Sequence, residues 1–430
     1  MDKFQITGGT PLEGIIRVSG AKNSALPCMA AAILTEDEVV LENIPQVRDI
    51  NTERKLLSSM GAEVGSSEDH STRIRCAVLS DPVAKYEIVK TMRASSLVLG
   101  PLVARAGIAR VAMPGGCAIG GRPIDLHIKG LEKMGAEIVQ AHGYIEARAE
   151  RLKGAHIVFD KITVTGTEDL LMAATLAEGE TLMENCAREP EVSDLAALLV
   201  KMGAKIEGAG TSTIRVQGVD RLQGATHAII PDRIEAGTFL AAGAITRGDL
   251  TVAGCDPSHL GAVIAKIQEA GAQVDVISPD SVRVHANGPL RAADISTEEY
   301  PGFPTDMQAQ FMALVTQSEG VSLVKENIFE NRFMHVQELV RMGAGIKVEG
   351  SIATVRGPAR LSGAYVMCSD LRASASLVLA ALVADGQSVL DRVYHMDRGY
   401  ERIEEKLRGV GAKIERVTNA PDPAEESVVN

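Results

Sequence analysis

Leu57-Ser-Ser-Met-Gly61-Ala62 is the stretch that decides the fold, because its pattern of Leu or Ile followed four residues later by Gly-Ala occurs six times. The other copies are Leu131/Gly135, Leu199/Gly203, Ile267/Gly271, Leu339/Gly343 and Leu407/Gly411. Successive glycines are 74, 68, 68, 72 and 68 residues apart, which is too long for a solenoid repeat and long enough for a small α/β module. The sequence therefore predicts six copies of one module.

Each module has an Ala-, Leu- and Val-rich stretch without a polar face, upstream of the Gly-Ala pair. The stretches cover residues 25–34, 94–104, 170–177, 238–245, 309–315 and 373–383. A helix that is apolar all round is a buried helix, so we expect the six to stack against one another. The glycines suit the left-handed cap that ends a second, amphipathic helix. The module is thus a buried helix, a strand, a loop, a surface helix and further strands.

A chain of 430 residues exceeds what one hydrophobic core usually supports. Three modules per domain give residues 22–229 as one domain and residues 1–21 with 230–418 as the other. The hinge strands would be Ser19-Gly20-Ala21 and Ile230-Pro231-Asp232, beside a cleft that closes on a ligand. The acidic, Pro-containing tail 419–430 is predicted to be disordered.

The second module carries an insertion. From the turn after the buried helix to the closing glycine it spans 28 residues, against 23 to 25 in four other modules. The insertion contains four glycines and two prolines around Cys117 and Arg122, as in an active-site lid, although a simple turn is the alternative. A polar loop beside an arginine makes a thiol reactive. Cys28, in a buried helix, fits the commoner role of a small hydrophobe.

Polar and mostly basic side chains recur at two places in the module. Those at the starts of the buried helices are Lys22-Asn23, Arg93, Arg233, Asp306 and Arg372, and those in the loop before the surface helix are Arg48, Arg122, Arg332 and Arg398. Helix N-termini favour anions, and guanidinium groups bind phosphate and carboxylate in a bidentate manner. A surface salt bridge explains any single arginine, but the recurrence indicates an anion-binding site.

Composition excludes several classes of protein. With 44 basic and 56 acidic side chains the net charge is −12, so an anionic ligand needs a local positive pocket. The absence of Trp and 3% aromatic content argue against a nucleic-acid partner. No apolar run approaches the roughly 20 residues of a membrane span. Six cysteines without a CxxC pair, and no recognisable signal peptide, predict a reduced cytoplasmic protein without a metal site.

Several long motifs, in order from about residue 2 to 418, resemble those of the UDP-N-acetylglucosamine 1-carboxyvinyltransferase family of enolpyruvyl transferases. The motifs are Ser19-Gly-Ala-Lys22-Asn23, the Cys117 loop to His127, Phe303 to Gln310, Phe329 to His335, Asp370 to Ser376 and Asp397 to Tyr400. The resemblance implies two inside-out α/β barrels of three modules each. It also implies transfer of enolpyruvate from phosphoenolpyruvate to the 3′-hydroxyl of UDP-N-acetylglucosamine, the first committed step of peptidoglycan synthesis, with release of phosphate and without metal or organic cofactor.

The resemblance also implies a role for individual residues. Cys117 is the general acid at the methylene carbon, Asp306 is the base for the sugar hydroxyl, and Lys22 and Arg398 complete the catalytic set. Phosphoenolpyruvate is bound by Lys22, Asn23, Arg122, Arg372 and Arg398. UDP-N-acetylglucosamine is bound by Asn23, Arg93, Arg122, Pro123, Ile124, Asp125, Leu126, Lys161, Ile162, Thr163, Val164, Asp306 and Ile328.

Two alternative functions make different demands on Cys117 and Asp306. A 5-enolpyruvylshikimate-3-phosphate synthase shares the fold and the donor, but it does not use a catalytic thiol of the Cys117 type. A non-catalytic nucleotide-sugar sensor would be expected to lose Cys117 or Asp306, and both are present. The sequence leaves oligomeric state and regulation open.

Overall fold

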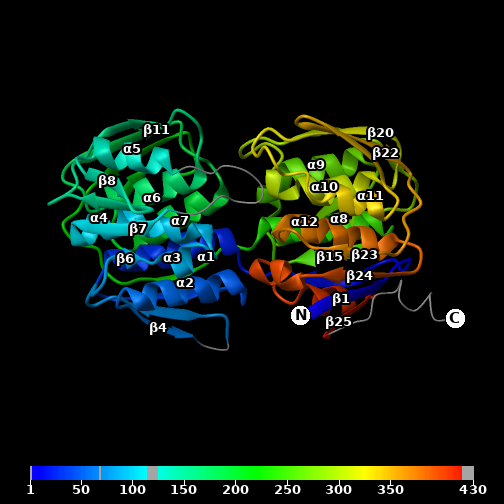
Figure 1. Cartoon of the computed structure of the whole chain (residues 1–430), viewed down its shortest axis with the longest axis horizontal. Helices are drawn as coiled ribbons and strands as arrows, with labels where there is room; N and C mark the ends of the chain where they lie inside the picture. The colour runs from blue at the N-terminus through cyan, green and yellow to red at the C-terminus, as the bar shows by residue number, and fades with distance from the viewer. Residues whose placement is uncertain (1, 67–68, 114–123, 419–430) are drawn as a thin grey trace. The chain divides into compact units, whose positions relative to one another are not determined.

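The computed structural model describes residues 2–66, 69–113 and 124–418. These residues form two compact units (Figure 1). The described residues between Gly20 and Ile230 make up the N-terminal unit. Residues 2–19 and 231–418 make up the C-terminal unit.

The described residues form six sheets, three in each unit, and these sheets are the outer layer of the modules. In the N-terminal unit their strand orders are β14(Thr226–Ala228)-β3(Glu38–Glu42)-β5(Thr72–Arg75)-β4(Glu63–Ser66), β6(Val83–Ala84)-β7(Ile108–Ala112)-β9(Tyr144–Arg148)-β8(Glu137–Ala141) and β10(His156–Val158)-β11(Glu180–Glu184)-β13(Thr213–Gln217)-β12(Lys205–Glu207). In each sheet the first pair is parallel and the others are antiparallel. One topology therefore repeats along the chain.

The C-terminal unit has the same kind of sheets, and two of them contain strands from the start of the chain. The strand orders are β16(Gln273–Ser278)-β17(Ser281–His285)-β15(Asp249–Ala253)-β2(Glu13–Arg17), β18(Leu290–Arg291)-β20(Ser318–Lys325)-β22(Ile352–Gly357)-β21(Gly345–Glu349), with β19(Ile295–Ser296) beside β20, and β23(Tyr365–Met367)-β24(Gln387–Asp391)-β1(Asp2–Thr7)-β25(Lys413–Thr418). Strand β1 lies between β24 and β25, so the first and the last described strands share one sheet.

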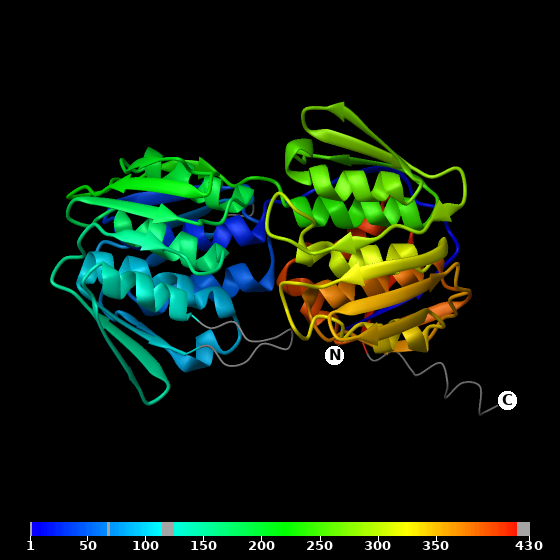
Figure 2. The same cartoon turned by 90° about the horizontal axis from the view of Figure 1, so that it is seen from above.

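Apolar helices fill the inside of each unit (Figure 2). They are α1(Lys22–Ala31), α4(Leu99–Ala106) after the 3₁₀ turn η2(Arg93–Val98), and α6(Val164–Ala174) in one unit, and α8(Arg233–Ile245), α10(Gln308–Val315) and α12(Leu371–Val383) in the other. Helices inside and sheets outside confirm the predicted inside-out α/β fold. Helix α6 begins six residues before the predicted stretch and α8 five residues before, because polar side chains in the first turns hid the helix starts.

The Leu-x-x-x-Gly-Ala pattern is the end of each surface helix. These helices are α2(Arg48–Ser59), α5(Asp125–Lys133), α7(Pro190–Lys201), α9(Gly261–Glu269), α11(Val336–Arg341) and α13(Ile403–Arg408). In the first module Gly61 has φ +106°, and the Ala62 N–H donates to the Leu57 carbonyl at 3.1 Å. This is the Schellman cap, and it places the apolar residue four positions before the glycine. The six Leu or Ile side chains are at most 1% exposed, so the pattern anchors each surface helix to the core.

Candidate active site

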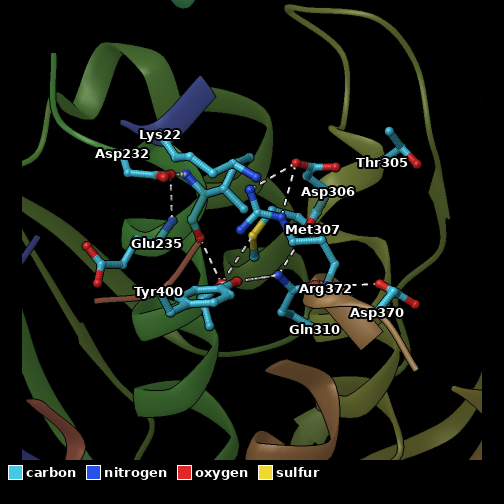
Figure 3. A network of polar contacts seen from close by, with 12 residues as sticks. Lys22, Asp232, Glu235, Thr305, Asp306, Met307, Gln310, Asp370, Arg372 and Tyr400 are labelled. Atoms are coloured by element: carbon cyan, nitrogen blue, oxygen red, sulfur yellow. Dashed lines mark hydrogen bonds and ion pairs between the residues drawn. The ribbon is translucent and has the colours of Figure 1, made fainter. Parts of the chain in front are cut away.

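Asp306 is the centre of the best-defined polar cluster in the C-terminal unit (Figure 3). It lies in the 3₁₀ turn η4(Thr305–Met307) that leads into α10. Its Oδ1 is 2.7 Å from Arg332 Nη2, and its Oδ2 is 3.0 Å from Arg372 Nη2. The two arginine side chains are 5% and 4% exposed, whereas Asp306 is 26% exposed. The aspartate thus faces outward from a pair of buried cations.

The Arg372 guanidinium is held in its charged form. Burial is the largest single influence and lowers its pKa, but Asp306, Tyr400 and Asp232 together outweigh burial, and the net pKa lies above the ordinary value. The guanidinium also lies 5.3 Å from the centre of the Tyr400 ring, in a cation–π arrangement. Breaking such a buried pair from either side leaves an uncompensated charge.

A buried hydrogen-bond network fixes the backbone at Asp306. Gln310, one turn further on, donates from Nε2 to the Asp306 carbonyl at 2.9 Å, to Thr238 Oγ1 at 3.1 Å and to Tyr400 Oη at 3.2 Å. Thr238 and Tyr400 are also joined, at 2.8 Å, and Figure 3 shows Gln310 and Tyr400 beside Asp306 and Arg372. Sequence reasoning missed this network, because its members come from three modules.

Glu326 is a second residue that sequence reasoning missed. Its side chain accepts from Thr305 Oγ1 at 2.9 Å and from the N–H of Ile328 at 2.9 Å. Thr305 in turn accepts from Arg332 Nη1 at 2.8 Å. Glu326 therefore connects the loop of Ile328 to the turn that carries Asp306. Its position at the end of β20 is not marked by any motif.

The starts of α8 and α12 in the C-terminal unit differ from what the sequence predicted. Free N–H groups were expected to help bind anions there, but Asp232 caps α8 by accepting from the N–H groups of Ile234 and Glu235 at 2.8 and 3.0 Å. Asp370 caps α12 in the same way. These N–H groups already have a carboxylate acceptor. At these two helix starts the arginine side chains are therefore the better candidates for anion binding, and Arg398, at the end of η5(Val393–Arg398), is partly exposed.

Lys22 and Asn23 open helix α1 in the N-terminal unit. Lys22 Nζ is 3.3 Å from Asp49 Oδ2 on α2, with 11% of the lysine side chain exposed, and Asn23 is exposed. Glu53 lies one turn after Asp49 and is buried, and neither of its oxygens has a hydrogen-bond partner in the described part of the chain. Burial first, and then the Asp49 charge, raise the pKa of Glu53 to about 8. A second negative charge beside Asp49 is thereby avoided at neutral pH.

Most of the residues expected near the UDP-sugar come from two adjoining segments of the N-terminal unit. Ile124 is the N-cap of α5, followed by Asp125 and Leu126, and the other segment runs from Lys161 to Val164. Lys129 Nζ lies 3.9 Å from Asp125 and 3.1 Å from Asp160, so one ammonium group links the segments. A groove of about 450 Å³ lies here, lined by Leu126, Lys129 and Asp160 among others.

Thr163 and His127 add two further features to these segments. Thr163 caps α6 through a 3.2 Å hydrogen bond from the Gly166 N–H. His127 is 2% exposed, and burial first, then Arg93, lower its pKa to about 4. The imidazole is therefore neutral at neutral pH. Cys117, Arg122 and Pro123 lie outside the described residues, so their predicted roles stay predictions.

Cys28, Asp194 and His227 form the one cluster of possible metal ligands among the residues that the structure describes. Both ring nitrogens of His227 are already engaged, Nε2 by Asp194 at 2.8 Å and Nδ1 by Lys201 at 3.1 Å. Burial, followed by the Asp194 charge, raises the pKa of the Cys28 thiol well above its ordinary value. A protonated thiol and an engaged imidazole do not make a metal site.

Comparisons with known proteins identify the class of protein to which the chain belongs. A family model described as EPSP synthase (3-phosphoshikimate 1-carboxyvinyltransferase) matches residues 6–407. The solved structure of the enolpyruvyl transferase NikO from Streptomyces tendae is 26% identical, with a TM-score of 0.87, and the match covers 98% of this chain and 99% of that one. An EPSP synthase from Acinetobacter baumannii, 19% identical with a TM-score of 0.73, shares the fold over 97% of this chain and 100% of its own. The chain belongs to the EPSP synthase family of carboxyvinyltransferases.

Closer relatives place the chain within that class. The UDP-N-acetylglucosamine 1-carboxyvinyltransferase of Acidobacterium capsulatum is 76% identical over 422 residues, which is 97% of both chains. Its namesake in Koribacter versatilis is 72% identical over 420 residues, again 97% of both chains. The chain is therefore a member of the UDP-N-acetylglucosamine 1-carboxyvinyltransferases. Among the described residues, no helix is both long enough and apolar enough to cross a membrane.

Proposed function

We propose that this protein transfers the enolpyruvyl group of phosphoenolpyruvate to the 3′-hydroxyl of UDP-N-acetylglucosamine, and that phosphate is released. The names of the relatives that are 72–76% identical over 97% of the chain support the reaction. The observation that carries the proposal is the outward-facing Asp306 carboxylate on two buried arginines. It combines a proton acceptor with cations that suit phosphate and carboxylate.

The reaction needs a base, an acid and a site for the leaving phosphate. A base removes the proton of the sugar hydroxyl as its oxygen bonds to C2 of phosphoenolpyruvate, and an acid adds a proton to C3. The resulting adduct then loses phosphate from C2 and a proton from C3, which restores the double bond. We assign the base to Asp306 and the acid to Cys117.

The two oxygens of Asp306 are engaged in different ways, and this suggests how the base becomes available. Oδ1 accepts from Arg332, and Oδ2 accepts from Arg372 Nε at 3.1 Å and from Nη2. A phosphate or carboxylate that takes over the Arg372 donors would leave Oδ2 open to the sugar hydroxyl. In this proposal, binding of phosphoenolpyruvate prepares the base for the second substrate.

We assign phosphoenolpyruvate binding to Lys22, Asn23, Arg122, Arg372 and Arg398. Lysine and guanidinium groups stabilise charge on a departing phosphate. We assign the UDP-sugar to Asn23, Arg93, Ile328, Asp306, residues 122–126 and residues 161–164. The groove beside Leu126 supports this assignment, because its lining includes Leu126 and ends at Asp160, directly before Lys161. We also infer a cytoplasmic location, which the free buried thiols at the five described cysteines support.

The test is phosphate release by the purified protein with both substrates, and with each omitted in turn. Release that requires both supports the proposal, and release from phosphoenolpyruvate alone would contradict it. Cys117→Ser should lose most activity because a hydroxyl is a far weaker acid than a thiol. Cys117→Asp should retain activity, since a carboxylic acid can still deliver a proton.

A further inference from the structure

Asp194 connects three segments of the N-terminal unit that are distant in the sequence. It lies on α7, with 4% of its side chain exposed. Its Oδ2 accepts from the hydroxyl of Ser24 on α1 at 2.5 Å and from the N–H of Ile230 at 3.3 Å. Its Oδ1 is 2.8 Å from Nε2 of His227 on β14. A carboxylate in the core with three donors is a strong tether.

The ring of His227 has a defined tautomer in this network. Lys201 Nζ lies 3.1 Å from its Nδ1, and because an ammonium group only donates, Nδ1 must accept. The proton of a neutral ring is then on Nε2, which donates to Asp194. The hydrogens on His227 Nε2 and on the Ser24 hydroxyl therefore have the same acceptor, the buried Asp194 carboxylate. Buried hydrogen bonds of this kind fix the side chains that make them.

Helix α1 lacks the local cap that three other buried helices have. Thr163, Asp232 and Asp370 cap α6, α8 and α12, whereas Ala21 precedes α1 and cannot cap it, and the first turn of α1 contains no acidic residue. Asp194 compensates from a different helix. It binds Ser24 directly, and it binds Ile230, whose carbonyl accepts from the Ala21 N–H at 2.8 Å.

We propose that Asp194, oriented by His227, is a positioning residue that holds the first turn of α1 and thereby sets Lys22 and Asn23 for phosphoenolpyruvate. Lys22 and Asn23 lie between the two tethered residues, Ala21 and Ser24. The inference rests on the proposed function, because it takes these two side chains as ligands of phosphoenolpyruvate. A first turn without its tether frays, and a displacement of about 1 Å in a binding group costs up to roughly 100-fold in rate.

The test compares two substitutions in the network with a matched one elsewhere. Asp194→Asn keeps the size but has one accepting oxygen for three donors, and Ser24→Ala removes one donor. We expect the KM for phosphoenolpyruvate to rise roughly 5-fold in Asp194→Asn and about 2-fold in Ser24→Ala, with the KM for UDP-N-acetylglucosamine changed less. The control is Thr35→Val, which removes a buried 2.9 Å hydrogen bond to the Leu222 carbonyl beyond the other end of the same buried segment.

Kinetics and hydrogen exchange decide the outcome together. Thr35→Val should lower Tm about as much as Asp194→Asn does, without raising the KM for phosphoenolpyruvate. An unchanged KM in Asp194→Asn, or an equal rise in Thr35→Val, would overturn the inference. Amide exchange at Ser24 and Ala25 should accelerate in Asp194→Asn and not in Thr35→Val. If the wild-type protein releases no phosphate, the proposed function fails. Amide exchange tests the tether separately: if exchange at Ser24 and Ala25 is not faster in Asp194→Asn, Asp194 does not hold the start of α1.

Discussion

In its described residues each unit has three buried helices and three outer sheets, but the titratable side chains that the two units bury are different. The C-terminal unit encloses Arg332 and Arg372 and neutralises them with Asp306. The N-terminal unit encloses the carboxyl groups of Glu53, Glu168 and others, and burial is the first cause of their raised pKa values. The module therefore fixes where a side chain lies, and the choice of residue fixes whether the position holds an anion, accepts a proton or stays neutral.

Removing the partly exposed Asp306 carboxylate, which lies beside two buried arginines, is the largest perturbation. Asp306→Asn keeps the size but cannot accept a proton, so turnover should fall roughly 100-fold or more. Binding of UDP-N-acetylglucosamine should weaken much less. Steady-state titrations with each substrate measure both quantities.

A matched control separates catalysis from loss of an ion pair. Asp249→Asn also removes an Asp–Arg pair of the C-terminal unit, at 2.5 Å from Arg283, but the aspartate side chain is 47% exposed. It should keep wild-type turnover. A raised KM with unchanged turnover in Asp306→Asn would make Asp306 a binding residue and leave the mechanism without its base.

Lys22 of the N-terminal unit and Arg398 of the C-terminal unit should both affect the KM for phosphoenolpyruvate. Lys22→Ala and Arg398→Ala should each raise the KM for phosphoenolpyruvate roughly 10-fold, since a hydrogen bond to a charged group contributes about 1.5–3 kcal/mol. Lys266→Ala removes a surface lysine that pairs with Glu269 at 2.7 Å, and it serves as the control. A rise confined to UDP-N-acetylglucosamine in either variant would reassign that residue to the sugar nucleotide.

Glu53 and Glu235 sharpen the comparison, because both are buried and, among the described residues, only Glu235 has a hydrogen-bond partner. The pKa of Glu53 is raised to about 8, so the folded state keeps a proton that the unfolded state loses above about pH 4.5. Wild-type stability should then fall with pH between about 5 and 8, by up to about 1.4 kcal/mol per pH unit from this group. Glu53→Gln removes that dependence, and urea unfolding at pH 5.5, 6.5 and 7.5 measures it.

Glu235 is the contrasting case in the C-terminal unit. Burial first raises its pKa to about 7, but its Oε1 lies 2.7 Å from Lys406 and its Oε2 accepts from the Ser19 N–H at 2.6 Å. Glu235→Gln should therefore destabilise the protein at pH 8, where Glu53→Gln should stabilise it relative to wild type. If both variants changed the free energy of unfolding in the same direction at pH 8, the assigned difference between Glu53 and Glu235 would be wrong.

The sequence predicted what depends on spacing and missed what depends on packing. The Leu57-to-Ala62 pattern predicted the six capped surface helices, because a Schellman cap is local. The capping role of Asp232 also had a local signal, a Glu three residues later, that went unused. The contact of Asp194 with Ser24 joins residues 170 apart, and no periodicity marks it. The contacts of Glu326 likewise leave no signal in the sequence, because its partners come together only when the modules fold.

The smallest expected effect compares two copies of the shared glycine, one from each unit. Gly61 and Gly411 have φ values of +106° and +102°, so an Ala in either place is strained by roughly 1–2 kcal/mol. An added Cβ at Gly61 would also lie 2.7 Å from the Val78 carbonyl oxygen, whereas at Gly411 the nearest atom is the Pro11 carbonyl oxygen at 3.7 Å. Gly61→Ala should thus lose more free energy of unfolding than Gly411→Ala, by about 1 kcal/mol, in chemical denaturation at one pH. Equal losses would show that the common backbone conformation alone sets the cost, and that the surroundings of each module add nothing.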